Sequence, residues 1–155
     1  MNRLLTAALL VAAFCASPAA LAQAYPVDDS GSQVLSGNVR MKWDSVLPRP
    51  GQASTMTGRL TVLVRLDVSP WRGRSGRIYK KLAPQPSGPV LAQWTSRGVL
   101  LPGQLRDGER TLVYSGPIVA DRLEDTLMVT LQADGDRLPD QSQLSFTFEI
   151  ELESP

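Results

Sequence analysis

One stretch of the chain groups side chains that are suited to binding an anion. Cations and aromatic rings alternate with glycine and serine in the segment WRGRSGRIYKK, which contains Trp71, Arg72, Arg74, Arg77, Tyr79, Lys80 and Lys81. Arginines beside exposed aromatic rings suit an anionic glycan, a phosphate group or an acidic protein partner. The other interpretation is a solvated loop whose cations balance acidic residues elsewhere. Only Trp71 is expected to be free, because Trp43 and Trp94 fall on strand patterns and are expected in the core.

The residue types that most catalytic sites require are missing. The chain has no histidine, and its single cysteine, Cys15, lies near the N-terminus. These absences exclude Ser-His-Asp hydrolysis, Cys-His chemistry and ordinary zinc sites. The carboxylates of Glu149, Glu151 and Glu153 alternate with apolar residues, which predicts a solvent-exposed strand face rather than a catalytic pair. The sequence therefore predicts a protein that is not an enzyme and that uses no cofactor and no metal ion.

The first 22 residues have the three parts of a secretory signal peptide. Arg3 precedes an apolar run from Leu4 to Phe14, and Ala20-Leu21-Ala22 supplies small residues at the spacing of a cleavage site. The apolar run is shorter than the roughly 20 residues that a transmembrane helix needs. We therefore expect cleavage after Ala22 and export to the periplasm or the cell surface.

Cleavage there would leave a chain without cysteine and without net charge. Loss of Arg3 reduces the 16 basic residues to 15, which equals the 15 acidic residues. No disulfide could then form, so the domain depends on its core. The balanced charge argues against nucleic acid or an anionic membrane as a partner. No second apolar stretch reaches the length of a membrane span.

Short alternating segments separated by glycine and proline predict an all-β domain. Apolar side chains occupy every second position in residues 60–68, 127–133 and 144–152, which is the pattern of half-buried strands. About seven such strands within residues 35–155 predict one antiparallel β-sandwich, and a small barrel is the alternative. Residues 23–34 are polar and turn-rich, and we expect a flexible leader there.

The first predicted strand of the domain alternates clearly. One of its faces carries Leu35, Gly37, Val39, Met41 and Trp43. The other face is polar. This strand could pair within its own sheet or with a neighbouring molecule, and the pattern alone does not distinguish the two.

An exported β-domain with an alternating strand near its mature N-terminus and a strongly alternating final strand resembles a subunit of chaperone–usher fimbriae. In that family an N-terminal extension completes a neighbour's incomplete immunoglobulin-like sandwich by strand addition. The segment Ser30–Trp43 (SGSQVLSGNVRMKW) is similar in kind. The branch that resembles the CFA/I-type pilus lacks a disulfide, as residues 23–155 do. The basic stretch Trp71–Lys81 has no counterpart in the family.

The resemblance implies an immunoglobulin-like sandwich that serves as a structural or adhesive component of fimbriae. Its partners would be fimbrial subunits or a chaperone, and strand addition would proceed through the segment Ser30–Trp43. The alternative hypothesis is a monomeric periplasmic binding module that holds an anionic glycan or an acidic partner through the Trp71–Lys81 loop.

Overall fold

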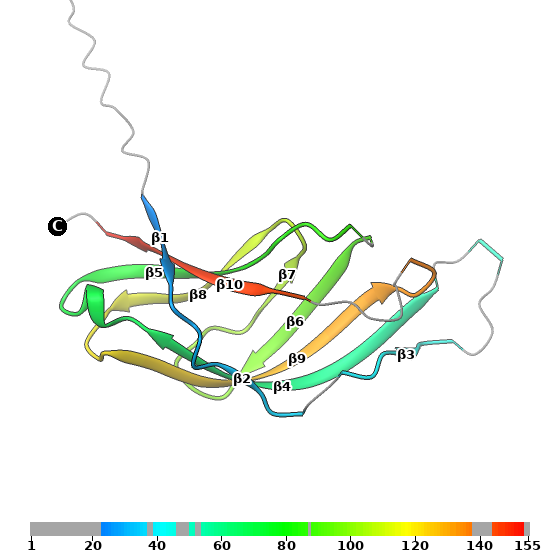
Figure 1. The fold of residues 1–155 in the computed structure, drawn as a ribbon, viewed down its shortest axis with the longest axis horizontal. Helices are drawn as coiled ribbons and strands as arrows, with labels where there is room; N and C mark the ends of the chain where they lie inside the picture. Colours follow the sequence, from blue (N-terminus) through cyan, green and yellow to red (C-terminus); the bar gives the residue numbers. More distant parts are fainter. Residues whose placement is uncertain are drawn as a thin grey trace, which may run out of the picture.

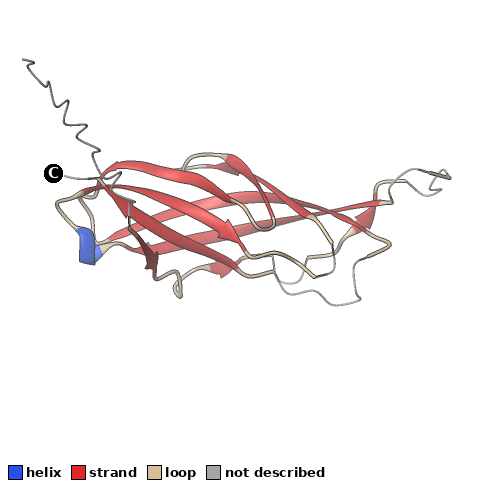
Figure 2. Cartoon of the chain, turned by 90° about the horizontal axis from the view of Figure 1, so that it is seen from above, coloured by secondary structure: helices blue, strands red, loops and turns tan. Residues whose placement is uncertain are grey.

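Two antiparallel sheets lie face to face in the computed structural model (Figures 1 and 2). The structure describes residues 23–36, 39–45, 50–51, 54–86, 88–137 and 144–153, so the predicted signal peptide lies outside it. Among the described residues, no helix is long and apolar enough to cross a membrane.

Each sheet is built from strands that are distant in the sequence. Sheet 1 has the strand order β1 (Ala24–Val27), β10 (Phe146–Leu152), β5 (Ser75–Leu82) and β8 (Arg110–Pro117). Sheet 2 has the order β2 (Gln33–Val34), β4 (Thr55–Asp67), β9 (Arg122–Asp134), β6 (Val90–Ser96) and β7 (Gly103–Arg106), and β3 (Lys42–Trp43) also pairs with β4. A short 3-10 helix, η1 (Ser69–Trp71), follows β4.

Alternate apolar side chains of both sheets fill the space between them. Those of β9 and β10 include Leu123, Leu127, Val129, Leu131, Ala133, Phe148 and Ile150, all of them buried. This alternation follows from the pleat, which turns successive side chains to opposite faces. The predicted all-β antiparallel sandwich is confirmed, and the two separate layers show that the chain does not form the small barrel.

The strand pairing is immunoglobulin-like. In sheet 2, β9 pairs with β4 on one side and with β6 on the other, and in sheet 1 β10 pairs with β5. These pairs correspond to the B–E–D and C–F neighbours of an immunoglobulin domain, in which strand G lies on the other side of strand F. Here the position beside β10 is occupied by β1, which comes from the N-terminal part of the chain (Figure 1).

The N-terminal segment differs from the sequence prediction in where its strands fall. Within the predicted leader 23–34, β1 pairs with β10 and β2 pairs with β4. The predicted continuous strand 35–43 is wrong, because among the described residues of this range only Lys42–Trp43 forms a strand. Gly37 lies outside the described residues. A turn follows β2, in which the Ser36 hydroxyl accepts a hydrogen bond from the Thr61 N–H at 3.1 Å. That side chain takes the place of a strand carbonyl, as serine does in turns.

Trp43 does not join the core, contrary to expectation. It is 48% exposed and its ring lies against Gly135, where an added Cβ would overlap the ring atoms. Val39 and Met41 lie over Gly58 of β4, where a Cβ would stand only 2.5 Å from the Met41 sulfur. Two glycines thus make room for side chains of this segment. Trp94 is buried, as predicted.

The basic stretch is a strand for most of its length, not a loop. Residues 75–82 form β5, which is paired on both sides, with β10 and with β8. The prediction of a loop over Trp71–Lys81 is therefore wrong for residues 75–81. Gly73, with a φ of 82°, and Gly76, which is buried under Ile150, explain the glycines that had indicated a loop.

A buried carboxylate fixes the connection between β6 and β7. Asp125 is 5% exposed and accepts hydrogen bonds from the Ser96 hydroxyl at 2.7 Å, the Leu100 N–H at 2.7 Å and the Thr126 N–H at 2.6 Å. Burial alone would raise the pKa of Asp125, but these hydrogen bonds lower it below its ordinary value. The charged carboxylate therefore stabilises the fold.

We predict that Asp125→Asn lowers the free energy of unfolding at neutral pH by about 1–3 kcal/mol, because an amide cannot accept all of these hydrogen bonds. The lowered pKa gives stability that is present above the ordinary carboxyl value and is lost as the pH falls through the folded value. The difference in the free energy of unfolding between Asp125→Asn and the unsubstituted protein should therefore be smaller at about pH 3 than at neutral pH. Urea unfolding at both pH values measures these free energies, and the exposed Asp121→Asn is the control. Equal stability of Asp125→Asn and the unsubstituted protein at neutral pH would contradict the prediction.

Candidate functional site at the edge of β10

Strand β10 is fully paired on one side and partly paired on the other. All of Phe146–Leu152 pairs with β5, whereas β1 pairs only with the four residues from Phe148 to Glu151. Within the described residues, Phe146 and Thr147 have no strand partner on the side of β1. A strand edge of this kind offers N–H and C=O groups that another strand can pair with.

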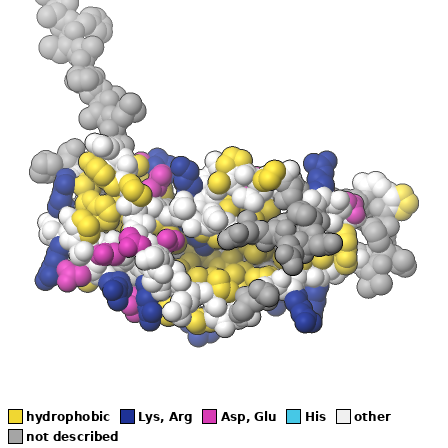
Figure 3. All heavy atoms as spheres, viewed as in Figure 1, with side chains coloured by type: hydrophobic (Ala, Val, Ile, Leu, Met, Phe, Trp, Pro, Cys, Tyr) yellow, Lys and Arg dark blue, Asp and Glu magenta, His cyan; other side chains and the backbone are white. Residues whose placement is uncertain are grey.

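The interior of the sandwich is accessible beside this edge. Figure 3 shows a hollow whose floor is hydrophobic, on the face that Figure 1 turns to the reader, between β10 and β4. Apolar side chains of both sheets and of the N-terminal segment are only partly buried against the core, among them Met41, Leu60, Val62, Leu144 and Phe146. An incompletely covered apolar interior favours the addition of further chain.

A lysine ammonium group lies inside the sandwich next to the unpaired end of β10. Lys80 alternates with Ile78 and Leu82 on the inner face of β5, and it is only 3% exposed. Its Nζ lies 4.4 Å from the centre of the Phe146 ring and 4.6 Å from that of Trp94. Within the described part of the chain the Lys80 ammonium group makes no hydrogen bond and no ion pair. Burial lowers the pKa of Lys80 to about 8, and the two rings offset part of the cost of burying the charge.

The outer face of sheet 1 carries a group of ion pairs. Arg110 of β8 reaches across β5 and binds Glu149 at 2.8 Å and Glu151 at 2.7 Å. Its guanidinium also lies 4.4 Å from the Tyr79 ring, and hydrogen bonds to the two carboxylates raise its pKa. The prediction that Glu151 faces solvent is wrong, since it is 7% exposed beneath this arginine. This arginine was not identified from the sequence.

The residues of the predicted anion-binding loop do not share one surface. Arg77, Tyr79 and Lys81 lie on the outer face of sheet 1, opposite to the buried Lys80. Lys81 pairs with Glu149 at 3.7 Å. The remaining three lie in and after η1. Trp71 is half-buried with its ring centre 6.5 Å from that of Tyr25, Arg72 pairs with Asp121 at 3.0 Å, and Arg74 is exposed.

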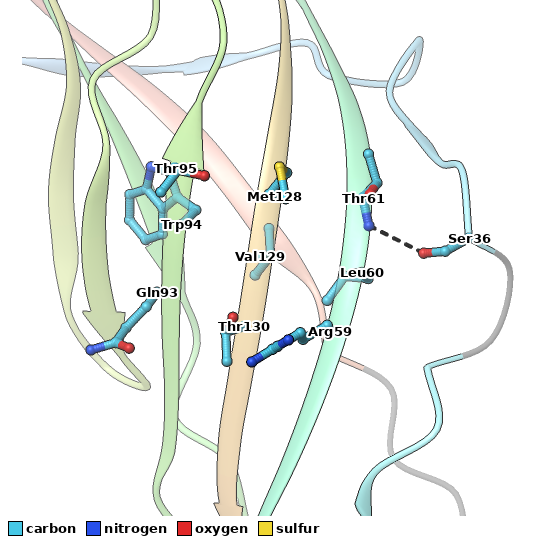
Figure 4. A pocket seen from close by; sticks show the side chains of 10 residues that line it. All are labelled: Ser36, Arg59, Leu60, Thr61, Gln93, Trp94, Thr95, Met128, Val129 and Thr130. Atoms are coloured by element: carbon cyan, nitrogen blue, oxygen red, sulfur yellow. Dashed lines mark hydrogen bonds between the residues drawn. The ribbon is translucent and has the colours of Figure 1, made fainter.

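A second concave surface lies on the outer face of sheet 2. Figure 4 shows side chains of three adjacent strands around a shallow groove of about 480 Å³, with Arg59 and Thr61 on β4, Met128 and Thr130 on β9, and Gln93 and Thr95 on β6. Ser36 closes one side through its bond to the Thr61 N–H. Arg59 is the one charged side chain in the described lining, so this groove lacks a set of groups that could act together on a ligand.

Among the described residues, no three acidic, histidine or cysteine side chains lie close enough to hold a metal ion. The Asp134 carboxylate accepts a hydrogen bond from the Asp136 N–H at 3.1 Å and pairs with Arg137 at 3.5 Å.

Comparisons with protein-family models, with curated proteins and with solved structures found no match to this chain.

Sequence reasoning missed the two features that define the site at β10. The position of Lys80 was readable from the alternation Ile78, Lys80, Leu82, which places its side chain on the apolar face of a strand. The pairing of β1 was not readable, because Ala24–Val27 is short and contains Pro26. Proline is tolerated in such an edge strand, where its missing N–H faces away from the ladder.

We predict that the protein becomes more stable as the pH rises from about 8 towards the ordinary lysine value, by up to roughly 3 kcal/mol. The folded pKa of Lys80 lies below its unfolded value of 10.5, so the unfolded chain binds more protons in this range and deprotonation favours the folded state. Urea unfolding at several pH values measures the slope of the free energy of unfolding against pH. Lys80→Met should remove most of it and Lys81→Met, on the opposite face, should keep it. A slope that survives in Lys80→Met would assign the effect to another group.

Proposed function

We propose that this protein is an exported, non-enzymatic component of fimbriae that assembles with other subunits by strand addition at the edge of β10. The observation that carries the proposal is the partial cover of this edge. The place where an immunoglobulin domain has strand G holds the four residues of β1, and the apolar interior beside them is accessible. Strand addition would pair the free backbone groups and cover that interior.

The short β1 is suited to exchange between molecules. Of its four residues only Val27 is buried, and burial of one valine contributes about 1.5–3 kcal/mol. Pro26 donates no backbone hydrogen bond. A strand held this weakly opens at low cost, and an identical strand from a second molecule can form the same contacts in its place.

The donor strand proposed here lies upstream of the segment predicted from the sequence. Of the predicted residues, Val39 and Met41 lie over β4 of their own chain, and Leu35 and Trp43 are exposed at 55% and 48%. The segment Ala24–Val27 precedes them and pairs with β10. In this proposal β1 is the donor, and the segment 30–43 connects it to the body of the subunit.

Export and the lack of enzymatic function belong to the same proposal. The three-part N-terminal pattern of residues 1–22 supports export to the periplasm or the cell surface. The lack of histidine and of cysteine beyond Cys15 supports a structural or adhesive role, with neighbouring subunits or a periplasmic chaperone as partners. The alternative of an anionic glycan at residues 71–81 gains no support, because Lys80 is buried and Arg72 and Lys81 are already ion-paired.

We predict that β1 of one molecule can be trapped on β10 of another. Val27 lies opposite Phe148 in the ladder, close enough for a disulfide between cysteines at the two positions. In a Cys15→Ser background, chains carrying Val27→Cys and chains carrying Phe148→Cys are mixed, unfolded, refolded together and oxidised. A disulfide-linked pair of the two chains on a non-reducing gel is the expected result.

Pro26→Cys mixed with Phe148→Cys is the matched control, because position 26 turns its side chain to the opposite face of the strand. This mixture should give little linked product. If the Val27→Cys mixture gives no more linked product than the control, β1 does not exchange and the proposed assembly is wrong.

A further inference from the structure

A cation without an anion lies beside the part of β10 that β1 leaves unpaired. The Lys80 Nζ is next to the Phe146 ring, at 4.4 Å, and has no ion-pair partner within the described residues. Phe146 belongs to the end of β10 that β1 does not reach. A buried charge of this kind is costly unless an opposite charge binds to it.

The register of β1 on β10 determines which donor residue would reach this cation. Val27 lies opposite Phe148, so a strand that continued in the same antiparallel register would set Asp28 opposite Thr147 and Asp29 opposite Phe146. Side chains two residues apart share a face. Val27 is buried at 6% exposure, so Asp29 of a continued strand would also face the interior.

The folded-back chain does not continue in this way. After Val27 it leaves β10 and crosses to sheet 2, where Asp28 forms a bridge with Asp67 of β4. The crossing places Asp28 beside Asp67 of β4. Burial, and to a smaller extent the charge of Asp28, raise the pKa of Asp29, whereas hydrogen bonds from Ser30 lower the pKa of Asp28. A strand that stays on β10 would turn the side chains of Asp28 and Asp29 to opposite faces of the sheet.

The distances allow the contact. A strand at the position of β1 is two strand spacings from β5, each about 4.8 Å. The Lys80 side chain already covers part of that span, because its Nζ lies beside the ring of Phe146 on the intervening strand. Lys80 lies opposite Phe148 in the ladder, so its side chain leans along β10 towards Phe146, which is the residue that Asp29 of a continued strand would face.

We propose, on the basis of the proposed strand addition, that the donor strand of an assembled subunit extends through Asp29 and that its carboxylate binds the Lys80 ammonium of the neighbouring copy. The occupant of the hollow beside Phe146 is thus residues 28 and 29 of a second copy of this chain. The ion pair fixes the register of the donor, because a shift by one residue would turn Asp29 to the outer face of the sheet.

The extended register is tested with full-length chains in the Cys15→Ser background. Mixtures of Asp29→Cys with Phe146→Cys should give a disulfide-linked pair after joint refolding and oxidation. Mixtures of Ser30→Cys with Phe146→Cys should not, because position 30 faces outward. Linkage in the Val27→Cys and Phe148→Cys mixture without linkage here would overturn this inference and leave the proposed strand addition standing. Linkage in neither mixture would reject both.

The ion pair itself is tested by the concentration at which chains assemble, followed by light scattering. Asp29→Asn and Lys80→Met should each weaken assembly by roughly tenfold or more, and the double variant should be no weaker than either single variant. Asp28→Asn is the matched control and should have little effect. Effects of Asp29→Asn and Lys80→Met that multiply in the double variant would show that the two side chains act independently, and would overturn the ion pair even where the disulfide forms.

Discussion

The partial cover of β10 by β1 is the feature on which the proposed strand addition depends. Strand β10 lies between β1 and β5 and contributes Phe148 and Ile150 to the core. Its edge on the side of β1 therefore borders the interior directly. Four residues of β1 cover part of this edge, and Val27 is the single apolar side chain that they bury. On its other side β10 pairs with β5 along its whole length. The stability of this edge is therefore local and low, while that of the rest of the domain is shared among many strands.

The long strands were predictable because burial on one face imposes a period of two. In β4, β9 and β10 the apolar residues alternate over more than half of each strand, and no alternative placement buries them. Strand β5 was missed because Gly73, Gly76 and a series of cations indicated a loop, although Ile78, Lys80 and Leu82 alternate along it. The exposure of Glu151 was predicted wrongly for a different reason. Its burial depends on Arg110, which lies 41 residues away and two strands across, and no local pattern contains that information.

The candidate site was likewise predictable from the sequence only in part. The apolar side chains at the hollow were expected on the inner face, because Leu144 and Phe146 continue the alternation of β10. The identity of the strand that covers the edge was not predictable, since a segment of four residues with a proline carries almost no pattern. The segment 35–43 has the stronger alternation, yet the turn at Ser36 and the room above Gly58 determine that its described residues 39–43 lie along β4. Tertiary contacts thus outweigh local propensity here.

The bridge formed by Arg110 has a mechanical consequence. Because it joins β8 to β10 over the intervening β5, a force that pulls β10 along its own axis is shared with two further strands through charged contacts on the outer face. These contacts act in parallel with the backbone ladder between β10 and β5, so both must yield before β10 slides. A load applied to β10 is therefore carried by the ion pairs and the backbone ladder on this side together, and not only by the short ladder that β1 forms on the opposite side.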